Sequence, residues 1–196
     1  MAKTLSCKRR RDNVTRKIIE STLVSLDGVI GDPHLWATRY FDSEAEKHAL
    51  ELLSTSDAML MGRRTYEFFG AAFPRQTGKY GQRVNEIRKY VFSSTLKKAD
   101  WSNSSIINGD VIAEAAKLKS QPGKNLVLYG HGLLGETLLK NDLLDELKLW
   151  INPCVVGRGK LFFREGEKTN LELIAQKTLA KGVVVLTYQP AGIANK

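Results

Sequence analysis

Short apolar runs alternate with segments of helical periodicity along most of this chain. The runs end at glycine, proline, serine or aspartate, which is typical of buried strands that stop at turns. They predict strands over 17–28, 57–62, 88–95, 104–109, 125–130 and 145–153, and two more within 171–190, joined near Lys181 and Gly182. Helices are expected over 42–56, 63–70, 110–120 and 131–141, with a loop rich in glycine and proline over 70–81.

The first predicted helix has a start signal and an apolar face. Ser43 is followed three residues later by Glu46, the pattern of a capping box. Ala45, Ala49, Leu52 and Leu53 recur at helical spacing.

Strands that alternate with helices favour parallel pairing through right-handed crossovers. The residues after 150 are strand-rich instead and predict an antiparallel hairpin. The pattern therefore predicts an α/β fold, with one mixed sheet flanked by helices.

Composition fits one domain. A chain of 196 residues with 42% hydrophobic content can build one sizeable core and is short for two. No apolar run approaches the roughly 20 residues that a membrane span requires, so no membrane partner is expected.

The positive charge is concentrated at the start of the chain. Residues 1–17 carry seven lysines and arginines against Asp12, a net +6, so the remainder holds only +3 of the total +9. We interpret residues 1–16 as a disordered basic leader before a domain over 17–190; the alternative is an arm that touches nucleic acid. The leader lacks the apolar core of a secretory signal.

Metal chemistry is not indicated. Cys7 and Cys154 form no C-x-x-C pair, and His34, His48 and His131 are not spaced like metal ligands. We expect a reduced, cytoplasmic protein without a metal.

Glycines mark three predicted strand ends, at Gly62, Gly109 and residues 130–132, where free backbone N–H groups can bind anions. Gly130, Gly132 and Gly135 match G-x-G-x-x-G literally. A Rossmann fingerprint, however, belongs to the first βα unit and has an acidic residue about 20 positions on; here the motif comes late and Val155 occupies that region. A phosphate cradle and simple strand–helix packing both remain open.

A second junction favours phosphate. Arg63 and Arg64 follow Gly62 at a predicted helix start, and paired guanidinium groups suit a monoester phosphate such as the 2′-phosphate of NADP. The alternative is two solvated arginines. Ser93 and Ser94 end the next strand and could add hydroxyl groups.

Five segments in order resemble the dihydrofolate reductase-like superfamily, most closely stand-alone relatives of the reductase domain of bifunctional riboflavin-biosynthesis deaminase-reductases. They are SLDGVIG (25–31), LMGRRTYE (60–67), KYVFSST (89–95), LYGHGLLGETLL (128–139) and LLDELKLWINPCVVGRGKLFF (143–163). The resemblance implies a mixed sheet of about eight strands, NADPH bound at the strand ends, and a homodimer.

The resemblance also implies site residues. The adenosine phosphates would be held by Gly62, Arg63, Arg64 and Thr65, with Ser93 and Ser94 nearby. The pyrophosphate and nicotinamide side would be held by Gly130, His131, Gly132, Leu133 and Leu134, and the nicotinamide pocket lined by Leu23, Ile30 and Gly31.

The chain departs from this pattern at three positions. His131 replaces the second glycine of a usual pair, where it either donates to phosphate or crowds the backbone. The riboflavin enzymes typically carry a lysine and an acidic residue where this chain has Ser21 and Tyr129. The zinc signature of a deaminase is absent from the sequence.

Hydride transfer needs a carboxylate or other proton source near the substrate nitrogen. Asp27 and Asp42 flank the loop that carries Trp36, and both are candidate catalytic residues. Asp27 could instead hold the Asp-Gly turn, and Asp42 could cap the following helix. Trp36 could stack on a flat heterocycle or fill the core.

These observations predict an NADPH-dependent reductase of a small heterocycle, of the dihydrofolate or 5-amino-6-(5-phosphoribosylamino)uracil type. The alternative is an NADP-binding protein of the same fold without turnover, and the third possibility is the nucleic-acid binder.

Overall fold

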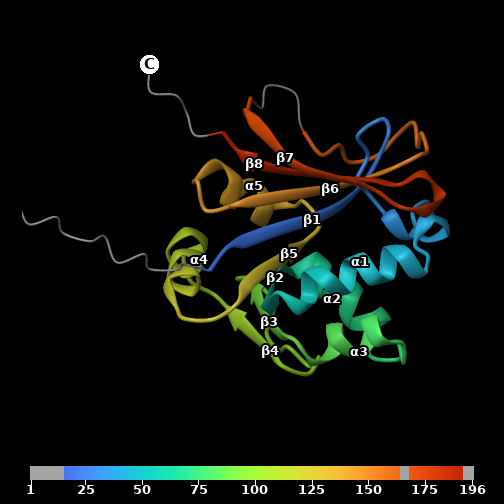
Figure 1. Ribbon diagram of the computed structural model, residues 1–196. Helices are drawn as coiled ribbons and strands as arrows, with labels where there is room; N and C mark the ends of the chain where they lie inside the picture. Colours follow the sequence, from blue (N-terminus) through green and yellow to red (C-terminus); the bar gives the residue numbers. More distant parts are fainter. Residues whose placement is uncertain (1–15, 164–167, 192–196) are drawn as a thin grey trace, which may run out of the picture.

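The computed structural model describes residues 16–163 and 168–191. Within these ranges, eight strands form one sheet in the order β4-β3-β2-β5-β1-β6-β8-β7 (Figure 1). They are β1 (Ile18–Ser25), β2 (Ser56–Gly62), β3 (Arg88–Phe92), β4 (Ser104–Ile107), β5 (Asn125–Tyr129), β6 (Glu146–Asn152), β7 (Leu171–Thr178) and β8 (Val184–Pro190). Neighbours from β4 to β6 are parallel, whereas β8 runs antiparallel to both β6 and β7. The predicted mixed sheet and C-terminal hairpin are confirmed.

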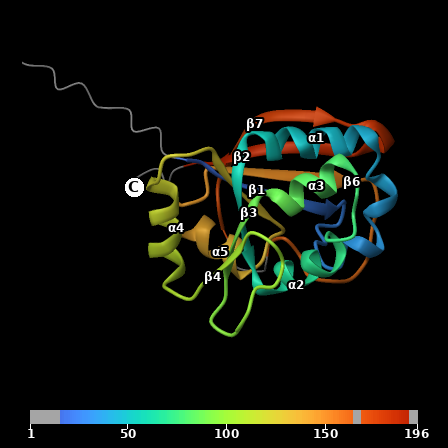
Figure 2. The same cartoon turned by 90° about the horizontal axis from the view of Figure 1, so that it is seen from below.

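Five α-helices of the described chain cover the two faces of the sheet (Figures 1 and 2). They are α1 (Ser43–Ser54), α2 (Arg63–Ala72), α3 (Lys79–Glu86), α4 (Val111–Ser120) and α5 (Leu133–Lys140). Tyr66 of α2 and Val84 of α3 pack with Met59 of β2 on one face. On the other face, Leu138 of α5 packs with the next residue of β2, Leu60. Successive residues of a strand point to opposite faces, so β2 needs apolar residues at consecutive positions.

The chain turns in opposite directions after two neighbouring strands. After β2 it enters α2, on the same face as α1 and α3, and goes on to β3. After β5, the neighbour of β2 on its other side, it enters α5 on the opposite face and goes on to β6. A crevice opens at the carboxyl ends of parallel strands where the connections diverge in this way, and it is the usual ligand site of open α/β sheets.

The prediction of a loop over 70–81 was wrong at both ends. Helix α2 continues to Ala72, and α3 begins at Lys79. A side chain of another helix caps the start of α3. Glu46 Oε1 of α1 accepts a hydrogen bond from the backbone N–H of Tyr80 at 3.3 Å.

The predicted capping box at Ser43 was also wrong. Asp42 is the N-cap of α1, and its Oδ1 accepts from the backbone N–H groups of Glu44 and Ala45, at 3.1 Å each. A carboxylate one position earlier satisfies the free N–H groups that a hydroxyl at Ser43 would otherwise have to reach.

Arg16, the last residue of the predicted leader, contacts the rest of the fold. Arg16 is buried, pairs with Asp57 and donates from Nε to the carbonyl of Lys124 at 2.6 Å. The expected disorder of the leader concerns residues 1–15, which lie outside the described residues. None of the described helices is long and apolar enough to cross a membrane.

Candidate functional site

Three of the predicted phosphate-binding segments leave the sheet side by side. The register sets Leu60 of β2 opposite Leu128 of β5, so Gly62 and Gly130, each two residues further on, emerge as neighbours. On its other side Gly62 is opposite Phe92, the last residue of β3, and Ser93 follows directly. The structure therefore brings Gly62, Gly130 and Ser93 together at the divergence point between β2 and β5.

The backbone at these glycines is open to a ligand. A Cβ atom built on Gly62, Gly130 or Gly132 would meet no described atom within 4 Å. Gly130 has φ +74°, a conformation that side chains rarely adopt, and its N–H donates to the carbonyl of Ser21 at 3.0 Å. Gly132 is the N-cap of α5, and no described side chain caps that helix start. The uncapped N–H groups at the start of α5, beside this open space, suit an anion.

The two arginines differ in their surroundings. Arg63 donates from Nε to Glu67 Oε1 at 2.7 Å and from Nη1 to Thr95 Oγ1 at 2.9 Å, so it links the start of α2 to the exit of β3. Arg64 is exposed to solvent, and Thr65 behind it is partly buried.

Ser93 organises the turn that receives Arg63. Its Oγ accepts from the backbone N–H groups of Thr95 at 3.2 Å and Leu96 at 3.0 Å, while Ser94 is exposed at the tip. The guanidinium of Arg63 and this hydroxyl turn thus belong to one surface.

His131 turns its side chain into the protein. Its imidazole is buried, with Nδ1 2.9 Å from Oε1 of the fully buried Glu20 and its ring 4.1 Å from that of Phe162. In this orientation the imidazole supports the glycine turn from the inside and does not face a phosphate outside it.

The same pair explains Gly135. A Cβ there would lie 2.5 Å from Glu20 Oε2 and 3.0 Å from His131 Nδ1. Of the three glycines in G-x-G-x-x-G, Gly130 and Gly132 therefore border open space, and Gly135 permits the buried carboxylate to approach α5.

The loop after β1 reaches the same region. Ile30 donates its N–H to the carbonyl of Lys160 at 2.8 Å, and Gly31 lies against the Lys160 backbone. Ile30 is partly buried against the core under α5, whereas Leu23 packs on the α1 side with Trp150. The three residues predicted to line the nicotinamide pocket are therefore split between the two faces of the sheet.

Asp27 is fully occupied by hydrogen bonds. Oδ1 accepts from Ser25 Oγ at 2.6 Å and from the N–H of Val156 at 3.1 Å, and Oδ2 accepts from the N–H of Gly157 at 2.7 Å. These bonds, led by that from Ser25, lower the pKa of Asp27 to about 2. The carboxylate is ionised at neutral pH and ties the β1 turn to the loop after β6.

Asp42 and Trp36 also have partners within the protein. The carboxylate of Asp42 caps α1 as described above, and Trp36 donates its indole N–H to the carbonyl of Gly31 at 2.8 Å. Their predicted catalytic and substrate-binding roles stay predictions.

Comparison with known sequences decides the family. The model of the RibD C-terminal domain matches residues 16–185, almost all of the described chain. The chain belongs to the RibD C-terminal domain family. Two relatives from Bacillus subtilis (strain 168), the uncharacterized proteins YyaP and YwjB, are 31% and 28% identical to it. Their alignments cover 88% and 86% of this chain and 94% and 95% of theirs.

Solved structures show that this RibD C-terminal domain has the dihydrofolate reductase-like fold. A putative riboflavin biosynthesis protein from Shewanella sp. PV-4 superimposes with a TM-score of 0.69 at 21% identity, covering 89% of this chain and 99% of that one. The Thermotoga maritima diaminohydroxyphosphoribosylaminopyrimidine deaminase/5-amino-6-(5-phosphoribosylamino)uracil reductase gives 0.64 at 14% identity, covering 91% of this chain and 57% of the bifunctional one.

Two of the positions at which the sequence departs from the resemblance are neighbours in space. Ser21 and Tyr129 are cross-strand partners of β1 and β5. The hydroxyl of Ser21 accepts from the indole N–H of Trp150 at 3.0 Å, and burial raises the pKa of Tyr129 well above its usual value. Ser21 is buried and Tyr129 is partly buried with its hydroxyl inside, so a neutral pair occupies the positions where the resemblance implies a lysine and an acid.

Lys160 and Glu20 were missed by the sequence reasoning. Lys160 Nζ donates to the carbonyl of His131 at 3.0 Å and lies 3.4 Å from Glu136 Oε1 in the first turn of α5. The only signal for Lys160 was its position in the GRGK stretch, and the only signal for Glu20 was its charge within a strand whose other residues are uncharged.

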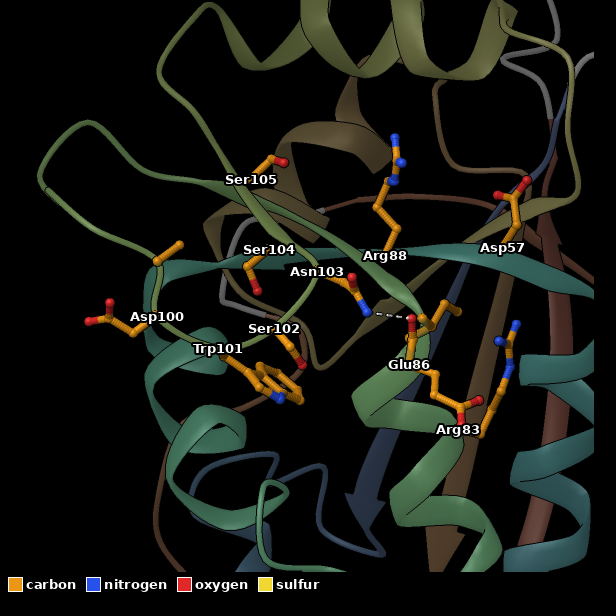
Figure 3. Close-up of a pocket in the computed structure, with 12 residues that line it drawn as sticks. Asp57, Arg83, Glu86, Arg88, Asp100, Trp101, Ser102, Asn103, Ser104 and Ser105 are labelled. Carbon is orange, nitrogen blue, oxygen red and sulfur yellow. Dashed lines mark hydrogen bonds between the residues drawn. The ribbon is translucent and has the colours of Figure 1, made fainter.

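A polar hollow also opens at the opposite edge of the sheet, around the amino ends of β3 and β4 (Figure 3). Two of its charged groups have partners within the protein: Arg83 donates to the carbonyls of Leu53 and Ser56, and Asp57 pairs with Arg16. The hollow lies at the amino ends of the strands, whereas the open glycines that form the candidate site lie at the carboxyl ends.

Among the described residues, no three His, Cys, Asp or Glu side chains come close enough together to hold a metal ion.

Proposed function

We propose that this protein is an NADPH-dependent reductase that delivers hydride to a small heterocycle. The observation that carries the proposal is the adjacency of Gly62 and Gly130 at the divergence point of β2 and β5. A dinucleotide that spans this point meets Arg63 and Arg64 at one end and the turn 130–132 at the other. Membership of a reductase-domain family and the reductase named for the Thermotoga maritima structure support the same reading.

The residues present fit the coenzyme. Exposed guanidinium groups suit the 2′-phosphate, and the open, uncapped start of α5 suits the pyrophosphate. Bound reduced nicotinamide would supply the hydride. The chain would hold both phosphate ends and fix the ring beside Ile30 and Gly31.

The substrate must then receive a proton. Asp27, with its pKa lowered to about 2, is a poor donor at neutral pH. We therefore propose Asp42, at the end of the loop that carries Trp36, as the residue that supplies the proton. Trp36 would provide a surface on which a flat substrate ring stacks.

The neutral Ser21–Tyr129 pair bears on the substrate class. A phosphoribosyl substrate carries charge that the family's lysine would offset, and burying such charge unpaired is costly. We propose that the substrate is an uncharged pteridine-like or aminopyrimidine heterocycle. The phosphorylated riboflavin intermediate is the less favoured substrate.

Coenzyme titration tests the first half of the proposal. We expect NADPH to bind at least about tenfold more tightly than NADH. This difference in binding free energy is what one strong charge-assisted hydrogen bond contributes. Replacing both Arg63 and Arg64 by alanine should abolish that preference and leave NADH binding unchanged. A preference that survives the double change would contradict the phosphate assignment.

Turnover tests the second half. NADPH oxidation is measured with dihydropterin, dihydrofolate and aminopyrimidine substrates. Tight NADPH binding without oxidation by any of them would favour the alternative, an NADP-binding protein that lacks catalysis.

A further inference from the structure

Lys160 connects two segments that the proposed coenzyme would contact. Its backbone belongs to a short antiparallel ribbon in which Val29 bridges to Leu161, and the N–H of Phe162 donates to the carbonyl of Gly28 at 2.9 Å. This pairing holds the backbone of Lys160 close to Gly31. A Cβ atom on Gly31 would lie only 3.2 Å from the Lys160 backbone nitrogen.

The side chain of Lys160 crosses from this ribbon to the glycine turn. Its ammonium donates to the carbonyl of His131 at 3.0 Å and lies 3.4 Å from the carboxylate of Glu136. The side chain is 37% exposed, so the ammonium is at the surface of the site and not within the core. One residue thereby sets the distance between the loop after β1 and the turn 130–132.

The charges beneath the turn make this cation significant. Glu20 is fully buried against His131, and its Oε2 has no hydrogen-bond partner among the described residues. Glu136 adds a second carboxylate within the first turn of α5. The carboxylate of Glu136 would oppose an incoming pyrophosphate, and in a partly dry site such repulsion is stronger than in water. Lys160 contacts both the turn and Glu136.

We propose that Lys160 is a positioning residue for the pyrophosphate–nicotinamide half of the coenzyme. It holds the turn 130–132 against the loop at Gly31 and offsets the charge of Glu136 where the pyrophosphate binds. This inference rests on the proposed coenzyme site, and it assigns to Lys160 no contact with the adenosine 2′-phosphate.

The test separates the two halves of the coenzyme. Adenosine 2′-monophosphate carries the 2′-phosphate end and lacks both the pyrophosphate and the nicotinamide half. For Lys160→Met, we expect calorimetric titration to show NADPH affinity reduced at least about tenfold, and adenosine 2′-monophosphate affinity unchanged. Lys160→Arg should retain most of the NADPH affinity. The exposed Lys47→Met is the matched control for loss of one positive charge and should change neither affinity.

A second variant examines the charge. Adding Glu136→Gln to Lys160→Met should restore part of the NADPH affinity if the lysine acts by offsetting that carboxylate. Melting temperatures of all variants are measured beside the titrations, so that a loss of folding is recognised as such.

The outcomes are distinct. Equal losses for both ligands, or no loss for either, would overturn the role of Lys160 while leaving the coenzyme site intact. Wild-type protein that binds neither NADPH nor adenosine 2′-monophosphate would overturn the proposed function, and the role of Lys160 with it.

Discussion

At the scale of single residues, hydrogen bonds decide what a carboxylate can do. Asp27 accepts from one hydroxyl and two backbone N–H groups, all of which stabilise its ionised form. Its pKa falls from 3.8 to about 2, so the folded protein binds the proton less readily than the unfolded chain. The resulting stabilisation is complete above about pH 4 and disappears as the pH falls towards 2.

We therefore expect Asp27→Asn to lower stability at neutral pH and to flatten the loss of stability between pH 4 and pH 2. Urea unfolding midpoints at several pH values measure this. Asp142→Asn, at an exposed position, serves as the control. If the urea midpoints of wild type and Asp27→Asn fall equally between pH 4 and pH 2, the stability of the turn does not depend on the ionised carboxylate.

The residues of the site divide into those that sequence could identify and those that it could not. Gly62, Arg63 and Gly130 could be named as candidates because a glycine or an arginine at a strand end has a local physical reason. The orientation of His131 was not, since it depends on Glu20, which lies 111 positions earlier in the chain. Lys160 is similar, because its partners come from the loop after β1 and from α5.

At the scale of elements, all eight strands were predictable from apolar runs, and α3 was not. Its start depends on Glu46, contributed by α1 from 34 positions away. A local pattern cannot show a cap supplied from another helix. The start of α1 was misplaced by one residue because Asp42 and Ser43 are both good N-cap residues, and only the geometry shows which one caps.

The cap of α1 can be separated from the catalytic role proposed for Asp42. We expect Asp42→Ala to destabilise the protein by about 1 kcal/mol and Asp42→Ser, which keeps a capping oxygen, to cost much less. Ser43→Ala should change stability by only a few tenths of a kcal/mol, the range of ordinary surface changes. Thermal unfolding measures all three.

The same set of variants informs the mechanism. Turnover lost in Asp42→Ser at near-normal stability would assign a chemical role to the carboxylate. Full turnover in that variant would leave Asp42 with capping alone, and a destabilised Ser43→Ala would contradict the cap seen here.

At the scale of the whole molecule, β7 leaves one edge of the sheet exposed (Figure 1). Leu173 and Ile174 on this strand are 48% and 44% exposed, and a bulge lies between Leu173 and Ala175. Edge strands with exposed apolar residues readily pair with another strand. Because the resemblance implies a homodimer, we propose that a second copy of the chain pairs with this edge.

The strand is complementary to itself in charge. Glu172 is opposite Gln189 of β8, and Lys177 is opposite Val185. Gln189 and Val185 are an even number of residues apart and therefore point to the same face of the sheet, so the side chains of Glu172 and Lys177 share that face. In an antiparallel β7–β7 pair centred between Ile174 and Ala175, Glu172 of each copy would be opposite Lys177 of the other. Cross-strand pairs of opposite charge are favourable and like charges are not.

Sedimentation velocity tests this pairing. We expect wild-type protein to sediment as a dimer, and either Glu172→Lys or Lys177→Glu alone to shift it towards monomer, because each places like charges opposite one another. The double exchange should restore the dimer, since the charges are then opposite again with reversed sign. Loss of dimer in the double variant as well would show that the two positions do not face each other, and monomeric wild-type protein would refute pairing at this edge.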